Sequence, residues 1–182
     1  MPNLLTKGKA LFGAADLTTL AIGGTNVDAT AAEINRAADV SARIVNATAA
    51  TLAVTAASHD SKVVTLNRAA GIAVTLPAAT GSGIKLHFVV GTTITSNTTT
   101  IKVTGNDTMT GTAINQADGG SHTAVMFKTA ATDDTITMDG TTTGGIKGDS
   151  VELIDIATDL WWVRVVGSAT GTEATPFSAT VA

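Results

Sequence analysis

The stretch "KVVTLNRAAGIAVTLPAATGSGIKLHFVVG", residues 62–91, indicates the fold class of this chain. It contains three short runs, 62–67, 71–77 and 85–91, in which apolar side chains are consecutive or alternate with polar ones. Their β-branched residues favour strands over helices. The intervening "RAAG" and "AATGSG" have the small residues of loops. The stretch therefore predicts three successive strands.

Runs of the same kind continue the series on both sides of this stretch. They recur at intervals of roughly 8 to 14 residues without a helical pattern between them, which is typical of all-β folds. We therefore predict a mainly β fold, an antiparallel β-sandwich or barrel-like domain over residues 47–182. A nucleotide-binding parallel sheet is not expected, because parallel strands usually need crossover helices. The further runs are 51–56, 98–105, 107–114, 123–129, 134–140, 149–156 and 160–166.

The composition supports this fold class and argues against several partners. Hydrophobic residues make up 44% of the 182 residues, but the chain has 31 alanines and 34 threonines against 4 phenylalanines and 2 tryptophans. The net charge is −4 and the 11 basic residues are scattered, so no nucleic-acid partner is expected. No apolar run approaches the ~18 residues of a membrane span, and no signal-like start is present. The absence of cysteine excludes disulfides and thiolate zinc sites.

The N-terminal residues predict an arm followed by a short helix. Residues 1–27 have no steady hydrophobic period and indicate an extended arm, either disordered or ordered only against a partner. In residues 28–46, Thr30 and Glu33 have the spacing of a helical capping box. The small apolar face of this helix is expected to pack on the body or on copies of itself. This candidate oligomer face contains Ile34, Ala37 and Ala38.

No catalytic constellation is evident, and we expect a protein that is not an enzyme. His87 lies within an apolar strand, where a packed role is expected, and His59 lies in a turn. Ser121, His122 and Asp118 are near in sequence, but a nucleophile needs its base and an oxyanion donor in a defined geometry. No G-x-S-x-G motif occurs in the chain.

No metal or cofactor site is expected either. The carboxylates of Asp133, Asp134 and Asp139 are close in sequence, but their spacing does not match a calcium loop, so a surface turn is the preferred interpretation. The glycine pair Gly144 and Gly145 lies between two predicted strands. This segment does not match a phosphate-binding loop, and its glycines are expected to provide positive φ angles in a hairpin connection.

The two adjacent tryptophans point to an interface. Neighbouring side chains in a strand face opposite sides of the sheet, so Trp161 and Trp162 cannot both fill one core. Tryptophan is enriched at the centres of protein interfaces. The alternative is that the second ring is covered by a loop or by the C-terminal segment around Phe177, which is predicted to be an edge strand or a strap. Trp161, Trp162 and Phe177 are therefore candidate interface residues.

Several segments together resemble virion structural proteins of tailed bacteriophages, of the capsid decoration, cement or head-fibre kind. They are "TAAEINRAADVSARIVNATAATLAV" (30–54), "LNRAAGIAVTLPAATGSG" (66–83), "MDGTTTGGIKGDSVEL" (138–153) and "GTEATPFSATV" (171–181). The resemblance extends from about residue 22 to the C-terminus. It implies a homotrimer of β-domains on the outside of the capsid, made in the cytoplasm of the host bacterium, with the major capsid protein as partner.

The resemblance supplies no catalytic residues and no fixed attachment motif. We expect the arm to be the part that attaches to the capsid. The alternative interpretation is a phage fibre or tail-tip module that binds host surface glycan, for which the chain has few aromatic residues. The apolar residues of the arm that are candidates for attachment are Leu4, Leu5, Leu11 and Phe12.

Overall fold

A computed structural model describes residues 21–22, 24–26, 29–30, 33–35, 43–118 and 123–180. The chain divides into two units, residues 1–40 and residues 41–182. In the first unit, strands β1 (Ala21–Ile22) and β2 (Thr25–Asn26) form an antiparallel pair within the predicted arm. The predicted attachment residues lie outside the described residues: Leu4, Leu5, Leu11 and Phe12.

The predicted capping box is confirmed. The amide of Thr30 donates to Glu33 Oε2 at 2.7 Å, and the amide of Glu33 donates to Thr30 Oγ1 at 3.3 Å. Residues 33–35 are helical, as this cap predicts. Ile34 is 40% exposed, while Ala37 and Ala38 of the predicted oligomer face lie outside the described residues.

The second unit contains all ten predicted strands and adds β3, while β14 is the edge strand that was one of the two predictions for the segment around Phe177. Because β3 begins at Ile44, the predicted boundary of the β-domain at residue 47 is three residues too late. Ala47 faces the core and β3 pairs with β5, so tertiary pairing determines the conformation of this segment. The bounds are β3 Ile44–Ala47, β4 Thr51–Ala53, β5 Lys62–Leu66, β6 Ala73–Thr75, β7 Lys85–Val90, β8 Thr99–Lys102, β9 Thr108–Ala117, β10 Ala124–Lys128, β11 Thr135–Met138, β12 Ser150–Ala157, β13 Leu160–Ala169 and β14 Phe177–Ser178.

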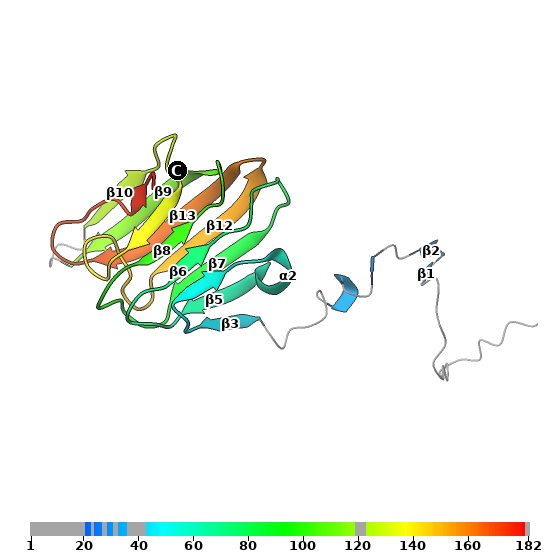
Figure 1. Cartoon of the computed structure of the whole chain (residues 1–182), viewed down its shortest axis with the longest axis horizontal. Coiled ribbons are helices and arrows are strands. Elements are labelled where there is room, and N and C mark those ends of the chain that lie inside the picture. Colours follow the sequence, from blue (N-terminus) through cyan, green and yellow to red (C-terminus); the bar gives the residue numbers. More distant parts are fainter. Residues whose placement is uncertain are drawn as a thin grey trace, which may run out of the picture. The chain divides into compact units, whose positions relative to one another are not determined.

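The strands of this unit form a sandwich of two sheets (Figure 1). The seven-stranded sheet has the order β10-β9-β13-β12-β7-β5-β3, and the five-stranded sheet has the order β14-β11-β8-β6-β4. The predicted mainly β fold is confirmed, and of its two predicted forms, sandwich or barrel-like, the structure has the sandwich. The sheets are nevertheless mixed and not wholly antiparallel, because β3, β5 and β7 pair in parallel, as do β4, β6 and β8.

The parallel pairing among β3 to β8 follows from the path of the chain, whereas β9 and β13 also pair in parallel but are further apart in the chain. From β3 to β8, successive strands alternate between the two sheets, so each strand from β3 to β6 pairs with the strand two places further along. A strand of the opposite sheet thus replaces the helix that usually connects parallel strands. This arrangement requires no helical sequence, which is why the spacing of the runs did not reveal it.

One helical turn interrupts this pattern where the sequence predicted a loop. Helix α2 (Ala56–His59) ends at His59, which the sequence placed in a turn. His59 is 6% exposed, and its Nδ1 accepts a hydrogen bond from the amide of Thr55 at 3.1 Å. The ring of His59 thus satisfies a backbone donor next to the start of the turn, which is a structural role.

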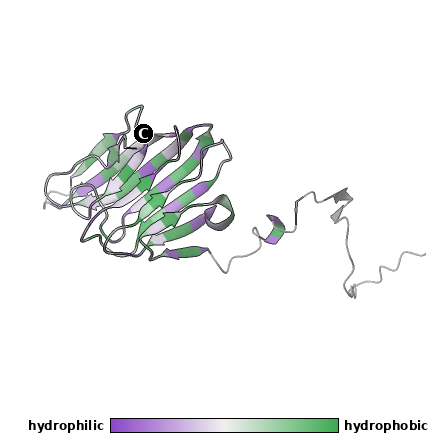
Figure 2. Cartoon of the chain, viewed as in Figure 1, coloured by the Kyte–Doolittle hydropathy of each residue, from purple (hydrophilic) through white to green (hydrophobic). Residues whose placement is uncertain are grey.

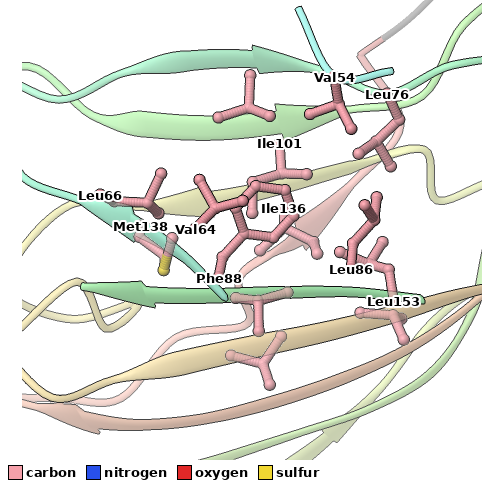
Figure 3. Packing of buried hydrophobic residues seen from close by; sticks show 14 of the residues in the cluster. Val54, Val64, Leu66, Leu76, Leu86, Phe88, Ile101, Ile136, Met138 and Leu153 are labelled. Carbon is pink, nitrogen blue, oxygen red and sulfur yellow. The ribbon is translucent and has the colours of Figure 1, made fainter. Parts of the chain in front are cut away.

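The core lies between the two sheets. Figure 3 shows side chains such as Ile101 and Ile136 of the five-stranded sheet meeting Phe88 and Leu153 of the seven-stranded sheet. Hydropathy alternates along the strands, so that one face of each strand supplies this core (Figure 2). Phe177 is 5% exposed and belongs to the core cluster. Its predicted role at an oligomer interface is therefore wrong, because β14 turns this ring inward.

Candidate interaction surface and buried carboxylates

The outer face of the seven-stranded sheet, the face turned away from the core, carries large side chains without a covering layer in the described structure. Trp161 is 0% exposed in the core, whereas Trp162 points to the outer face and is half-buried. The prediction that the two rings face opposite sides is confirmed. Strand register places Trp162 beside Ile154 of β12, and Ile154 beside Lys85 of β7.

An apolar patch lies at the β10 end of the outer face. Met126 of β10 is paired with Ile114 of β9, which is paired in turn with Val166 of β13. Met126 is 68% exposed and Val166 is 46% exposed. We call these three side chains the apolar patch. The strand β10 is also the last strand of the sheet, so its outer backbone edge has no neighbouring strand within the described residues.

A hollow of about 460 Å³ lies on the same face over β5, β7 and β12. Two cross-strand pairs of β12 and β7 line it. One pair is Ile154 with Lys85, and the other is Glu152 with His87. Arg164 binds Glu152 with an Nη2–Oε2 distance of 2.7 Å. The residues that line the hollow are Ser61, Lys62, Val63, Lys85, Leu86, His87, Glu152, Leu153 and Ile154.

The outer face of the five-stranded sheet is different. Its outward positions hold small or hydroxyl side chains, such as Ala53, Thr75 and Thr100, together with Lys102. Among the described residues of this unit, the exposed large hydrophobic side chains lie on strands of the seven-stranded sheet: Ile44, Met126, Ile156 and Val166. This asymmetry makes the seven-stranded sheet the candidate interaction surface, because large contiguous patches of exposed apolar side chains mark contacts.

Asp155 fastens the loop "TGSG" (80–83) to the end of β12. Its carboxylate is 1% exposed and accepts hydrogen bonds from the amides of Gly81 at 2.7 Å and Ser82 at 2.9 Å, and from the amide of Thr80 at 3.0 Å. The hydroxyl of Ser82 donates a further bond at 2.6 Å. Burial raises the pKa of Asp155, but these hydrogen bonds outweigh it and lower the pKa to about 2.

Asp149 and Asp139 fix the segment between β11 and β12. Asp149 accepts hydrogen bonds from the amides of Gly145 at 2.8 Å and Ile146 at 2.9 Å, yet burial raises its pKa above the usual value. Burial also acts to raise the pKa of Asp139, but hydrogen bonds from Thr143 and Thr141 outweigh it and hold the pKa well below its usual range. Both carboxylates therefore serve as acceptors for backbone amides.

The acidic pair Asp133 and Asp134 was expected on a surface turn, but both are buried, with exposures of 8% and 5%. Asp133 accepts a hydrogen bond from the amide of Ala130 at 2.8 Å, and Asp134 accepts one from the amide of Thr180 at 2.8 Å. In the part of the chain that the structure describes, no three His, Asp or Glu side chains come together as metal ligands.

The glycine segment behaves as predicted in one respect and differs in another. Gly144 and Gly145 have φ angles of +84° and +97°, which confirms the expected positive values. The segment does not form a hairpin, because β11 belongs to the five-stranded sheet and β12 to the seven-stranded sheet. It is a crossing between the sheets, and the buried Asp149 supports it.

Two of the three histidines, His59 and His87, lie within the described residues. His87 was expected to be packed in an apolar strand, but it points to the outer face and lines the hollow. Ser121 and His122 lie outside the described residues. The alternation of "KLHFVV" could have placed His87 on the outer face, since Leu86 and Phe88 alternate with it.

Comparison with known protein families, with characterised proteins and with solved structures finds no match to this chain. None of the described helical segments has the length and apolar character needed to cross a membrane. The outer face of the seven-stranded sheet, with its apolar patch and its hollow, is the candidate functional surface of the described chain.

Proposed function

We propose that this protein is a non-enzymatic virion structural protein, a trimeric decoration protein on the outside of a phage capsid. In this role it binds the major capsid protein and stabilises the junctions between capsomers, after synthesis in the cytoplasm of the host bacterium. The observation that carries the proposal is the apolar patch beside the open edge of β10. The resemblance of the sequence to phage virion proteins supplies the place of action.

The form of the molecule suits such a role. A body held by buried carboxylates and a continuous core is a rigid platform, and the apolar patch offers a contact for a further copy of the chain. A trimer that touches several capsomers gains avidity from modest individual contacts. The threonine- and alanine-bearing face of the other sheet suits the side that remains in solvent.

Replacing both exposed residues of the apolar patch should abolish self-association. For the double variant Met126→Ser and Val166→Ser, we expect a monomer near 18.2 kDa, where the unchanged protein gives a species near three times 18.2 kDa. The reason is the loss of apolar area from the contact. Light scattering after size exclusion measures the mass. The matched control is Ala53→Ser with Thr75→Ser on the opposite sheet, which should remain trimeric.

A monomeric mass for the unchanged protein, or a trimer that persists in the double variant, would refute the patch as the self-contact. Circular dichroism of the variants confirms that they are folded.

Deleting residues 1–27 should abolish binding to the capsid and leave a folded trimer. The measurement is co-sedimentation with expanded capsids of the phage that encodes the chain, with the full chain as the reference. Capsid occupancy that is unchanged by the deletion would contradict attachment through the arm. If the full chain does not sediment with capsids, the decoration role is wrong.

The alternative function, a fibre or tail-tip module that binds host glycan, differs in its place on the particle. It predicts that the full chain fails to bind capsids and is recovered with tails or fibres. The hollow is the observation that favours saccharide binding, and such binding is compatible with either place on the particle.

A further inference from the structure

The hollow on the outer face is built on paired strands of the sheet. Its floor is formed by the central strands β5, β7 and β12, whose backbone groups are paired within the sheet. One wall is the turn after α2, where the amide of Ser61 donates to the carbonyl of Lys85 at 2.8 Å. Asp60 also binds this turn to β7, since its Oδ1 accepts a hydrogen bond from the amide of Lys85 at 3.1 Å.

The wall residue Ser61 adopts a φ angle of +58°, in the left-handed region that non-glycine residues rarely occupy. The surrounding hydrogen bonds hold it there. A hollow whose wall is held in an unfavourable conformation by neighbouring contacts is arranged before any ligand arrives, and such strain clusters at binding sites.

The hollow presents both donors and acceptors. Lys85 is a donor, the Glu152 carboxylate is an acceptor, and the His87 imidazole can serve as either. Arg164 holds Glu152 in place, and its charge offsets that of the carboxylate. Lys85 and Glu152 bring charges of both signs to the hollow, so it does not select strongly for an anion.

Ligands that present many hydroxyl groups match this set, because each hydroxyl both donates and accepts a hydrogen bond. Apolar surface is also present, since Val63 and Ile154 line the hollow. Trp162 lies next to Ile154 in the same cross-strand row, just beyond the residues that line the hollow. An aromatic ring beside a set of polar groups can contact the C–H face of a sugar ring. The volume of about 460 Å³ is within the range of small-molecule sites.

We propose that the hollow binds a pyranose oligosaccharide without strong net charge. Glu152 and His87 bind its hydroxyl groups, and Trp162 contacts one ring at the border of the hollow. The hollow lies on β5, β7 and β12, whereas the apolar patch lies on β9, β10 and β13. Saccharide binding therefore goes beyond the decoration role, and the two can be tested with separate variants.

The test uses the full chain and defined probes. A printed array of bacterial surface polysaccharides is followed by calorimetric titration with maltotriose, chitotriose and trigalacturonic acid. We expect binding to an array polysaccharide and to at least one of the two neutral trisaccharides. Glu152→Gln and His87→Ala should each weaken that binding about tenfold or more, because hydrogen bonds that involve charged groups are lost. Thr100→Ala on the opposite sheet is the matched control and should bind as the unchanged chain does.

Fluorescence locates the bound sugar. The intrinsic emission should change on binding in the unchanged chain, and Trp162→Phe should retain binding but lose that change, since Trp161 is buried in the core. Trp162→Ala should weaken binding. Thermal unfolding of every variant confirms that it is folded.

If the unchanged chain shows no measurable binding on the array or in the titrations, the proposal is overturned. So would undiminished binding in both Glu152→Gln and His87→Ala. Binding of trigalacturonic acid alone, lost in Lys85→Gln and retained in Glu152→Gln, would replace it with an anion site. Light scattering and capsid co-sedimentation of the hollow variants are expected to match those of the unchanged chain, which separates failure of this proposal from failure of the decoration role.

Discussion

Replacing Trp161 by alanine is expected to lower the free energy of unfolding by about 3 to 5 kcal/mol, the usual cost of removing a large buried aromatic side chain. The indole is 0% exposed and lies in the core between the sheets. Its N–H has no hydrogen-bond acceptor among the described residues, so the loss comes from packing and the cavity that remains. Urea denaturation, followed by circular dichroism, measures the change.

The neighbouring tryptophan is the control for this prediction. Trp162→Ala removes the same side chain from the outer face, where it is only half-buried, and should lower the free energy of unfolding by about 1 kcal/mol or less. Equal losses in the two variants would show that the outer face is covered as completely as the core. They would contradict the assignment of that face as an open surface.

Replacing Asp155 by alanine is expected to lower the free energy of unfolding by about 2 to 3 kcal/mol. The substitution leaves the backbone amides of Thr80, Gly81 and Ser82 without their shared acceptor. The loop "TGSG" should then separate from the end of β12. Hydrogen exchange at these three amides should accelerate, and urea denaturation should report the loss of stability.

The same carboxylate should make the protein sensitive to acid. Its folded pKa of about 2 lies below the unfolded value of 3.8, so its contribution is fully present above pH 3.8 and is lost as the pH falls through about 2. The difference corresponds to about 2 kcal/mol. Asp149 acts in the opposite direction. Because its folded pKa is raised, its contribution is present below pH 3.8 and is lost as the pH rises through its folded pKa.

The matched control for Asp155 is Asp159→Asn. Asp159 is exposed and has a φ angle of +59°, which asparagine tolerates, so stability should change by about 0.5 kcal/mol or less. If Asp155→Ala were as stable as this control, or kept the full acid dependence between pH 4 and pH 2, the proposed role of the carboxylate would be incorrect.

Several features of the fold and the candidate site could be predicted from local sequence. The ten runs mark strands because alternation and β-branching act within each strand. The capping box of Thr30 and Glu33 and the opposite directions of Trp161 and Trp162 follow from contacts or geometry over a few residues. The misplacement of His87 was a local error that alternation could have prevented, whereas other mistakes concern partners that are distant in sequence. Phe177 was assigned to an interface because nothing near it shows that β14 lies against β11.

The sequence by itself thus determined that this protein is mainly β, which faces of most of its strands are apolar, and where its helix cap forms. Only the tertiary structure decided which strands pair in parallel, that Asp155 reaches the amides of residues 80–82, and that the apolar patch and the hollow share one outer face. The physical reason is the separation in sequence over which each kind of interaction acts. Side-chain alternation and capping depend on neighbours in the chain, whereas sheet order and shared surfaces depend on how the whole core is buried.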